Sequence, residues 1–332
     1  MYKKYLSILF CFALLQINLP AQNKSLSAAS AKGLTTDMDG HSINAHGACI
    51  LKYNNTYYLF GEIKKGKTWL VANQSWEDYR VPAGGISCYS SKDLITWKNE
   101  GIALKPLTGK PSSEIDTGRV IERPKVIYNG RTKKFVMWLH IDKNDYSLSH
   151  AGVAISDKAT GPYTYLGSVA PNEQMSRDMT LFKDDDGKAY LIYASENNMT
   201  MQICLLSDDY LSPTKNYIRI LENQHREAPA LFKQNGKYFL ITSLCSGWDS
   251  NPATYAVANS MMGTWTQKGN PCVGSGAETT FNSQSTFVLP VDEKKGQYIF
   301  MADKWNKFDL QKSDYLWLRL TITNGQIEIT EN

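Results

Sequence analysis

Residues 178–196 have the sequence DMTLFKDDDGKAYLIYASE, and this pattern decides the fold. An acidic residue is followed by a short apolar strand, a turn and an aromatic-rich strand, which is typical of an antiparallel hairpin. The same pattern recurs at residues 46–62 (HGACILKYNNTYYLFGE), 122–140 (ERPKVIYNGRTKKFVMWLH), 227–243 (EAPALFKQNGKYFLITS) and 284–305 (QSTFVLPVDEKKGQYIFMADKW). Consecutive copies begin 49 to 76 residues apart, which leaves room for about four strands per unit, the size of a propeller blade. The sequence therefore predicts an all-β fold, a five-bladed β-propeller whose ring is closed jointly by residues 22–45 and the last strand, 316–330.

The chain has 332 residues and a formal net charge of +4, and its basic residues form no dense run, so a nucleic-acid partner is not expected. Residues 1–21 begin with Lys3 and Lys4, continue with an apolar stretch and end at the small residue Ala21, as in a cleaved signal peptide. The apolar stretch is shorter than the roughly 20 residues of a membrane span, and no later segment reaches that length. We expect residues 22–332 to form one propeller domain, a monomer exported to the periplasm or out of the cell.

Metal and disulfide patterns are weak in this sequence. Apart from Cys11, the cysteines are odd in number and scattered, and no histidine pair has the spacing of metal ligands. The triplet Asp184–Asp186 before Gly187 suggests a calcium loop, but Phe182 occupies the first ligand position, so a hairpin turn is predicted. We therefore expect no cofactor and predict no metal site, while a structural calcium or sodium ion in the channel stays open.

The start of each repeat predicts where the chemistry lies. The first strand of each propeller blade lines the central channel, so residues at the five strand starts converge on one rim. These residues are His46, Glu122, Asp178, Glu227 and Gln284. Carboxyl groups that share one pocket have pKa values that are pushed apart, and glycoside hydrolysis needs one protonated and one charged carboxyl group. The alternative interpretation is structural: each acid caps a strand and pairs with the arginine beside it.

The segments AHGACILKYNNTYYLFGE, IERPKVIYN, SRDMTLF, REAPALF and SQSTFVLP resemble glycoside hydrolase family 43, whose members are secreted five-bladed propellers acting on polysaccharides. The likeness covers about residues 35–330, and the AHG and SQS segments are similar to the exo-β-1,3-galactosidase branch. The resemblance implies an inverting enzyme that removes a terminal sugar, β-linked galactose first of all. An α-L-arabinofuranosidase and a β-D-galactofuranosidase are alternatives from the same family. A non-catalytic sugar-binding propeller is the alternative from another class.

The resemblance also implies roles for the rim residues. Glu227 in REAPALF matches the general acid of the family, and Asp178 in SRDMTLF matches the aspartate that adjusts the pKa of that acid. Where the family usually has its catalytic base, an aspartate, this chain has His46. In the galactan-cleaving branch the implied water holders are Gln284 and Glu122, and a glutamine amide is the poorer base of the two. His46 is a third candidate for the base.

Five residues are expected to contact the sugar, again by resemblance. They are Glu62, Tyr146, Glu196, Trp248 and His46. Glu62 and Glu196 are carboxylates at strand ends beside aromatic residues, which suits the binding of sugar hydroxyl groups. For Tyr146 and Trp248 the alternative is ordinary packing at the rim of the propeller.

Overall fold

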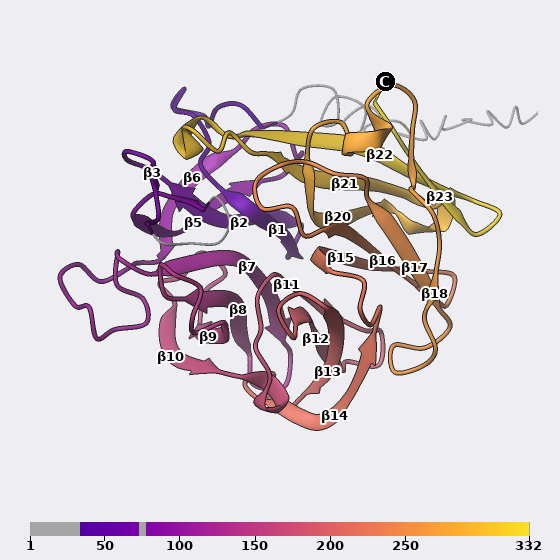
Figure 1. Ribbon diagram of the computed structural model, residues 1–332, viewed down its shortest axis with the longest axis horizontal. Helices are drawn as coiled ribbons and strands as arrows, with labels where there is room; N and C mark the ends of the chain where they lie inside the picture. Colours follow the sequence, from indigo (N-terminus) through magenta and orange to yellow (C-terminus); the bar gives the residue numbers. More distant parts are fainter. Residues whose placement is uncertain (1–33, 73–77, 332) are drawn as a thin grey trace, which may run out of the picture.

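The computed structural model describes residues 34–72 and 78–331, which form five sheets around one axis, all antiparallel except for one parallel strand pair at the outer edge of the fifth (Figure 1). The predicted all-β, five-bladed propeller is confirmed. The predicted signal peptide, residues 1–21, lies outside the described residues. Within the described part of the chain, no helix has the length and apolar character needed to cross a membrane.

The first four blades each contain four strands, with the first strand nearest the axis. Blade one contains β1 (His46–Tyr53), β2 (Thr56–Lys64), β5 (Ala83–Ser91) and β6 (Lys98–Leu104). Blade two contains β7 (Val120–Asn129), β8 (Lys134–Asp142), β9 (His150–Ser156) and β10 (Thr164–Val169). Blade three contains β11 (Met179–Lys183), β12 (Ala189–Ser195), β13 (Thr200–Leu206) and β14 (Pro213–Ile220). Blade four contains β15 (Arg226–Gln234), β16 (Lys237–Leu244), β17 (Thr254–Ala258) and β18 (Thr266–Gln267).

Blade five has an additional strand at its outer edge. From the axis outward it contains β20 (Gln284–Asp292), β21 (Gln297–Lys304), β22 (Asp314–Thr323), β23 (Gln326–Thr330) and β19 (Cys272–Val273). A separate two-stranded sheet lies between β2 and β5 in the sequence and contains β3 (Trp69–Leu70) and β4 (Tyr79–Arg80). The short 3-10 helices are η1 (Pro171–Glu173), η2 (Ala277–Thr279), η3 (Glu293–Lys295) and η4 (Leu310–Lys312).

The five innermost strands surround a central channel. Each of β1, β7, β11, β15 and β20 contacts the next one around the ring, and β20 contacts β1 (Figure 1). Apolar clusters fill the spaces between neighbouring blades, for example Phe60 with Met137 between blades one and two, and Trp138 with Tyr193 between blades two and three. Because burial of large side chains drives this packing, the starts of all five inner strands are held at one end of the channel.

The described part of residues 22–45 and the last strands do meet where the ring closes, as predicted, but they share no sheet, and residues 22–33 lie outside the described residues. The last strands do lie in blade five, but the described residues 34–45 add no strand to that sheet and form only an isolated bridge between Thr36 and Ser42. Instead, the Tyr315 hydroxyl on β22 accepts a hydrogen bond from the Ala45 backbone N–H (2.8 Å) and donates one to the Ile43 carbonyl (3.1 Å). Side-chain contacts between blades five and one therefore close the ring.

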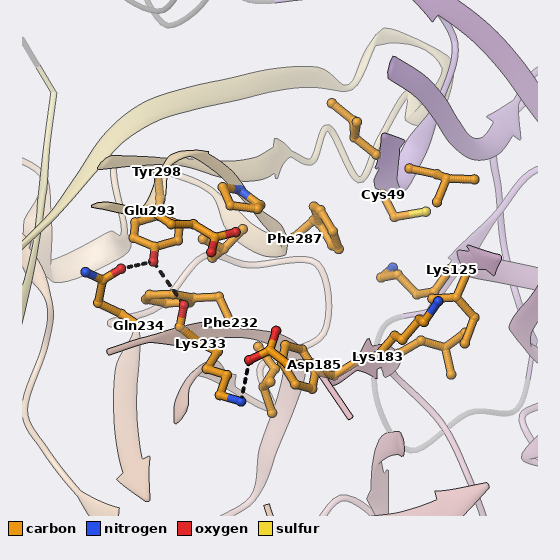
Figure 2. A pocket seen from close by; sticks show the side chains of 18 of the residues that line it. Cys49, Lys125, Lys183, Asp185, Phe232, Lys233, Gln234, Phe287, Glu293 and Tyr298 are labelled. Atoms are coloured by element: carbon orange, nitrogen blue, oxygen red, sulfur yellow. Dashed lines mark hydrogen bonds and ion pairs between the residues drawn. The ribbon is translucent and has the colours of Figure 1, made fainter. Parts of the chain in front are cut away.

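The channel end opposite the strand starts contains a cavity of about 430 Å³ (Figure 2). Its polar groups are paired with one another: Lys233 contacts Asp185 at 2.8 Å, and the Tyr298 hydroxyl donates to the Lys233 carbonyl at 3.0 Å. Lys183 donates to the Tyr128 carbonyl at 2.9 Å. Lys125 points into the channel and donates to a backbone carbonyl of blade one, and burial lowers its pKa to about 8. The polar groups named here therefore all have hydrogen-bond or ion-pair partners.

Candidate active site

A cavity of about 710 Å³ lies at the end of the channel where the inner strands begin. It brings together most of the residues predicted from the sequence, namely Glu62, Glu122, Tyr146, Asp178, Glu227, Trp248 and Gln284. Other lining residues were not predicted as site residues, among them Asp78, Arg123, His140, Asn198 and Trp305. The cavity is therefore lined by acidic, amide, cationic and aromatic side chains from several blades.

β-Bulges near the start of the inner strands position the site residues. The strand register shifts directly after His46, Glu122 and Glu227. The next residue in each case has a left-handed backbone: Gly47 has φ 56°, Arg123 has φ 53° and Ala228 has φ 53°. Arg123 and Ala228 adopt this conformation although they are not glycines, which places local backbone strain at the site.

Glu227 is a buried carboxyl group held by two amide donors. Asn198 Nδ2 donates to its Oε2 at 3.1 Å, and Gln284 Nε2 donates to its Oε1 at 2.9 Å. Burial, together with the negative charge of Asp178, raises the pKa of Glu227 to about 8. Glu227 therefore carries a proton at neutral pH, as a general acid requires.

Asp178 and Gln284 are linked to each other through Arg123. Arg123 Nη2 lies 3.0 Å from Asp178 Oδ2 and donates to Gln284 Oε1 at 2.5 Å. Asp178 Oδ2 also accepts a hydrogen bond from the Ala228 backbone N–H at 3.0 Å, and Trp305 Nε1 donates to Gln284 Oε1 at 3.0 Å. Both donors to Gln284 face its oxygen, so its amide group has a fixed orientation that directs Nε2 at the Glu227 carboxyl.

Glu122 lies on another wall of the cavity and is surrounded by cations. Lys64 Nζ donates to its Oε1 at 3.0 Å, the Tyr146 hydroxyl donates to its Oε2 at 3.1 Å, and His140 Nδ1 lies 3.6 Å from Oε2. Burial opposes ionisation, but Lys64, the His140 hydrogen bond and Arg80 hold the pKa of Glu122 well below its usual value. Glu122 is therefore a charged carboxylate at neutral pH.

His140 takes part in this charge arrangement. Burial would lower its pKa, but hydrogen bonds to Asp142 and Glu122 raise the pKa to about 9. Its Nε2 lies 3.1 Å from Asp142 Oδ2, so the imidazolium connects a structural carboxylate with Glu122. This arrangement stabilises the charge on Glu122.

Two further carboxyl groups on this side of the cavity have raised pKa values. Burial raises the pKa of Glu62 to about 8, with Lys64 opposing the shift. Burial raises the pKa of Asp78 to about 6, and here Arg80 opposes the shift. Lys64 contacts Glu62 and also lies over the indole ring of Trp248, 5.2 Å from its centroid.

His46 and Glu196 do not line the cavity, in contrast to the sequence prediction. His46 is 1 % exposed, and its Nδ1 lies 3.2 Å from Asp303 while its ring stacks on Tyr315 at 4.7 Å. Glu196 accepts two hydrogen bonds from Arg219, at 2.8 and 2.7 Å. Both side chains therefore contact other residues of the protein, and neither makes the sugar contact that was predicted for it.

A pattern in the repeats could have identified two of the residues that the sequence analysis missed, His140 and Lys64. Glu122 pairs across the sheet with His140, just as His46 pairs with Glu62, so the end of the second strand in each repeat also faces the site. Lys64 stands two residues after Glu62 and therefore on the same face of β2. Asp78 and Asn198 lie in the β3–β4 insertion and in a loop, which the repeat does not describe, whereas Trp305 is the last residue of the fifth repeat and directly follows β21.

Within residues 34–72 and 78–331, one group of side chains has metal-ligand geometry, and it lies outside the cavity. The ligand atoms of Asp37, Asp39 and His41 are within 4.8 Å of one another. Asp37 Oδ1 already accepts hydrogen bonds from the backbone N–H groups of Asp39 (3.0 Å) and His41 (2.9 Å). These hydrogen bonds are those of a turn at the surface.

Comparison with protein families gives one match along most of the chain. The family model described as glycosyl hydrolases family 43 matches residues 42–309. A curated β-D-galactofuranosidase of Aspergillus niger is 26 % identical over 208 residues, which cover 57 % of this chain and 59 % of that protein. The chain thus spans little more than half the length of this curated relative.

Solved structures give stronger similarity. A GH43 β-1,3-galactosidase with galactodeoxynojirimycin is 42 % identical, with a TM-score of 0.82, and the match covers 91 % of this chain and 98 % of that one. An exo-β-1,3-galactanase of Phanerochaete chrysosporium with galactose is 37 % identical, with a TM-score of 0.78 and coverage of 90 % and 65 %. An exo-β-1,3-galactanase of Clostridium thermocellum is 34 % identical, with a TM-score of 0.75 and coverage of 90 % and 64 %.

Proposed function

The chain belongs to family 43 of the glycosyl hydrolases, and within that family we propose that it is an exo-β-1,3-galactosidase that releases terminal β-linked galactose with inversion. One observation carries the reaction type. The cavity contains a protonated carboxyl group, Glu227, and an ionised one, Glu122, and their environments push the two pKa values apart. This difference is what acid-assisted glycoside hydrolysis requires.

In the proposed reaction Glu227 donates its proton to the oxygen of the leaving sugar. Asp178 keeps that proton on Glu227 at neutral pH through its negative charge, and Gln284 fixes the direction of the carboxyl group. A water attacks the anomeric carbon as the glycosidic bond breaks, and we assign to Glu122 the uptake of the proton of that water, because the Gln284 oxygen already accepts hydrogen bonds from Arg123 and Trp305. A carboxylate accepts up to about four hydrogen bonds, so Glu122 retains capacity for a water in addition to Lys64 and Tyr146. The reaction uses side chains and water.

The substrate is proposed from similarity. The structural relatives with 34–42 % identity are β-1,3-galactosidases and exo-β-1,3-galactanases, and they support galactose as the released sugar. The galactofuranosidase relative supports a furanoside as the second candidate. Pyranosides and furanosides differ in the placement of the same hydroxyl groups, so activity on defined substrates separates the two.

The deciding experiment compares the wild type with Glu227→Gln on β-1,3-galactan, arabinan and nitrophenyl glycosides of β-D-galactopyranose, β-D-galactofuranose and α-L-arabinofuranose. We expect galactose from galactan, initially released as the α-anomer by NMR, and a loss of about 10²–10⁴-fold in the variant. If sugar is released only from the furanosides, the substrate is a furanoside and the galactopyranoside assignment is wrong. Oligosaccharide binding without release would establish a sugar-binding propeller instead.

We also propose that the protein is exported and acts as a monomer. The signal-peptide pattern at residues 1–21 supports export. Mass spectrometry of the mature protein and light scattering would test the two statements.

A further inference from the structure

Asp78 is a buried carboxyl group of the cavity that lies outside the five-fold repeat. It directly precedes β4 in the small β3–β4 sheet, which no other blade contains. Its side chain is 1 % exposed, and it lines the cavity together with Glu62 and Glu122. The residue therefore belongs to the site, but the repeat gives it no role.

The segments flanking the β3–β4 sheet are attached to blade five. The Gly66 backbone N–H donates to Gln311 Oε1 at 2.9 Å, and the Leu310 backbone N–H donates to Thr68 Oγ1 at 2.9 Å. Trp305, a few residues before Leu310, also lines the cavity. These contacts fix the insertion against the same loop that carries part of the site, so the Asp78 backbone has a defined position.

The hydrogen bonding of Asp78 is incomplete. Its Oδ1 is in ion-pair contact with Arg80 Nη1, while its Oδ2 has no hydrogen-bond partner among the described residues. Glu62 Oε2, also buried and also in the cavity lining, lacks a partner in the same part of the chain. A buried polar atom without a partner is energetically unfavourable, so two such atoms in one cavity indicate a ligand that forms hydrogen bonds with them.

Arg80 gives this corner of the cavity a rigid base. Its guanidinium group lies 4.1 Å from the ring centroid of Tyr146, whose hydroxyl donates to Glu122. Asp78, Arg80, Tyr146 and Glu122 thus form a continuous wall. The unpartnered carboxyl oxygens Asp78 Oδ2 and Glu62 Oε2 are its free hydrogen-bonding positions among the described residues.

We propose that Asp78 is a specificity-determining residue, whose Oδ2 accepts a hydrogen bond from one hydroxyl group of the terminal sugar while Glu62 Oε2 binds a second one. This inference rests on the proposed function, because it needs the terminal sugar to occupy the cavity. A carboxylate oxygen that a substrate hydroxyl must satisfy rejects a sugar that lacks that hydroxyl or carries a substituent on it. The enzyme therefore takes an unsubstituted terminal sugar at this position.

The test uses nitrophenyl glycosides of the sugar that the wild type releases, as the parent compound and as a series of monodeoxy analogues. For Asp78→Asn we expect kcat/KM on the parent to fall about 10–100-fold, the range for a hydrogen bond to a charged group. On the one analogue that lacks the contacted hydroxyl, wild type and variant should differ less than threefold, because that analogue has already lost the interaction. Asp208→Asn, which changes an exposed aspartate paired with Arg131, is the matched control and should preserve the wild-type pattern.

Two results would overturn this assignment. Equal losses on the parent and on every analogue would make Asp78 a structural support for Arg80, and thermal unfolding of the variant would then show lower stability. If kcat/KM on the parent compound were unchanged in the variant, Asp78 would have no part in recognising the sugar. If the wild type releases no sugar, the proposed function fails separately, and the same comparison is made with dissociation constants of the same glycosides.

Discussion

Strand β11 has an aspartate at each end, and each is paired with a cation, Asp178 with Arg123 and Asp184 with Lys233, but only Asp178 lies beside a second carboxyl group. Asp178, before the strand, lies in the active-site cavity, where its charge raises the pKa of Glu227. Asp184, after the strand, contacts Lys233 Nζ and the Tyr238 hydroxyl, both at 2.5 Å. Asp178 therefore influences the ionisation of a neighbouring acid in addition to its own pairing, whereas Asp184 contacts only groups that stabilise its charge. The same residue type on one strand therefore serves chemistry at one end and stability at the other.

The two ends of the channel differ in the same way. Of the described residues that line the active-site cavity, Glu62, Asp78 and Asn198 have buried polar atoms without a hydrogen-bond partner. None of the described residues that line the opposite cavity has such an atom. A hollow at the end of a propeller channel is thus not itself evidence of a site. Buried polar groups without a hydrogen-bond partner distinguish the active end.

The largest expected effect is on catalytic activity, which should depend on Asp178 and not on Asp184. Asp178→Asn removes the negative charge beside Glu227, so ionisation of Glu227 becomes easier and its pKa falls. We expect kcat/KM to decrease about 100-fold, and the high-pH limb of its pH profile, which reports the acid, to move to lower pH. Measurement of kcat/KM between pH 4 and 9 on galactan oligosaccharides checks both. A loss of activity with an unmoved limb would assign Asp178 to substrate contact instead of pKa control.

This contrast also shows how much the sequence could predict. Hairpins at residues 46–62, 122–140, 178–196, 227–243 and 284–305 have strong alternation and clear turns, so blade number and the rim residues follow from pattern alone. The turn at Asp184–Asp186 was predicted correctly, since Gly187 N–H bonds back to the Asp184 carbonyl at 3.0 Å. Local pattern is sufficient where each element repeats.

Other parts of the site depend on contacts that no local pattern contains. The left-handed backbone of Arg123 and Ala228 is imposed by packing in the ring, because neither residue type prefers it. Glu196 matched the expected pattern of a strand-end carboxylate but is paired by Arg219, from a neighbouring strand. Asp78 reaches the cavity only because an insertion is attached to blade five. Such placements need the tertiary structure.

A second prediction concerns the stability cost of the active end. An ordinary glutamate releases its proton near pH 4.5, whereas folded Glu227 retains it to about pH 8, so the native state binds the extra proton between these values. The wild type therefore loses stability as pH rises from 4.5 to 8, and Glu227→Gln, which does not titrate, avoids this loss. We expect the variant to gain about 1–3 kcal/mol relative to wild type between pH 4.5 and 8. Urea unfolding of wild type and variant at pH 4.5 and at pH 8 measures this gain in unfolding free energy. If the two proteins differed by the same amount at both pH values, the pKa of Glu227 would not be raised.

The smallest expected effect lies at the other end of β11. Burial alone would raise the pKa of Asp184, but hydrogen bonds from Lys233 and Tyr238 hold it below its usual value. Asp184→Asn removes this charge-assisted pairing, and we expect a loss of about 1–2 kcal/mol of unfolding free energy at pH 7. Because the folded pKa is depressed, the stabilisation is present above the ordinary value of 3.8 and disappears as pH falls through the lower folded value. The difference between variant and wild type should therefore shrink toward pH 3.

Asp186→Asn is the matched control for this last change, since Asp186 stands two residues further along the same turn and pairs with Lys188 while half exposed. An exposed pair of this kind contributes about 0–1 kcal/mol, so the control should unfold close to the wild type. Both variants should retain kcat/KM within twofold, because neither residue lines the active-site cavity. If Asp184→Asn instead reduced kcat/KM as strongly as Asp178→Asn, the two ends of the channel would be coupled through β11, and the division between an active end and a stabilising end would be wrong.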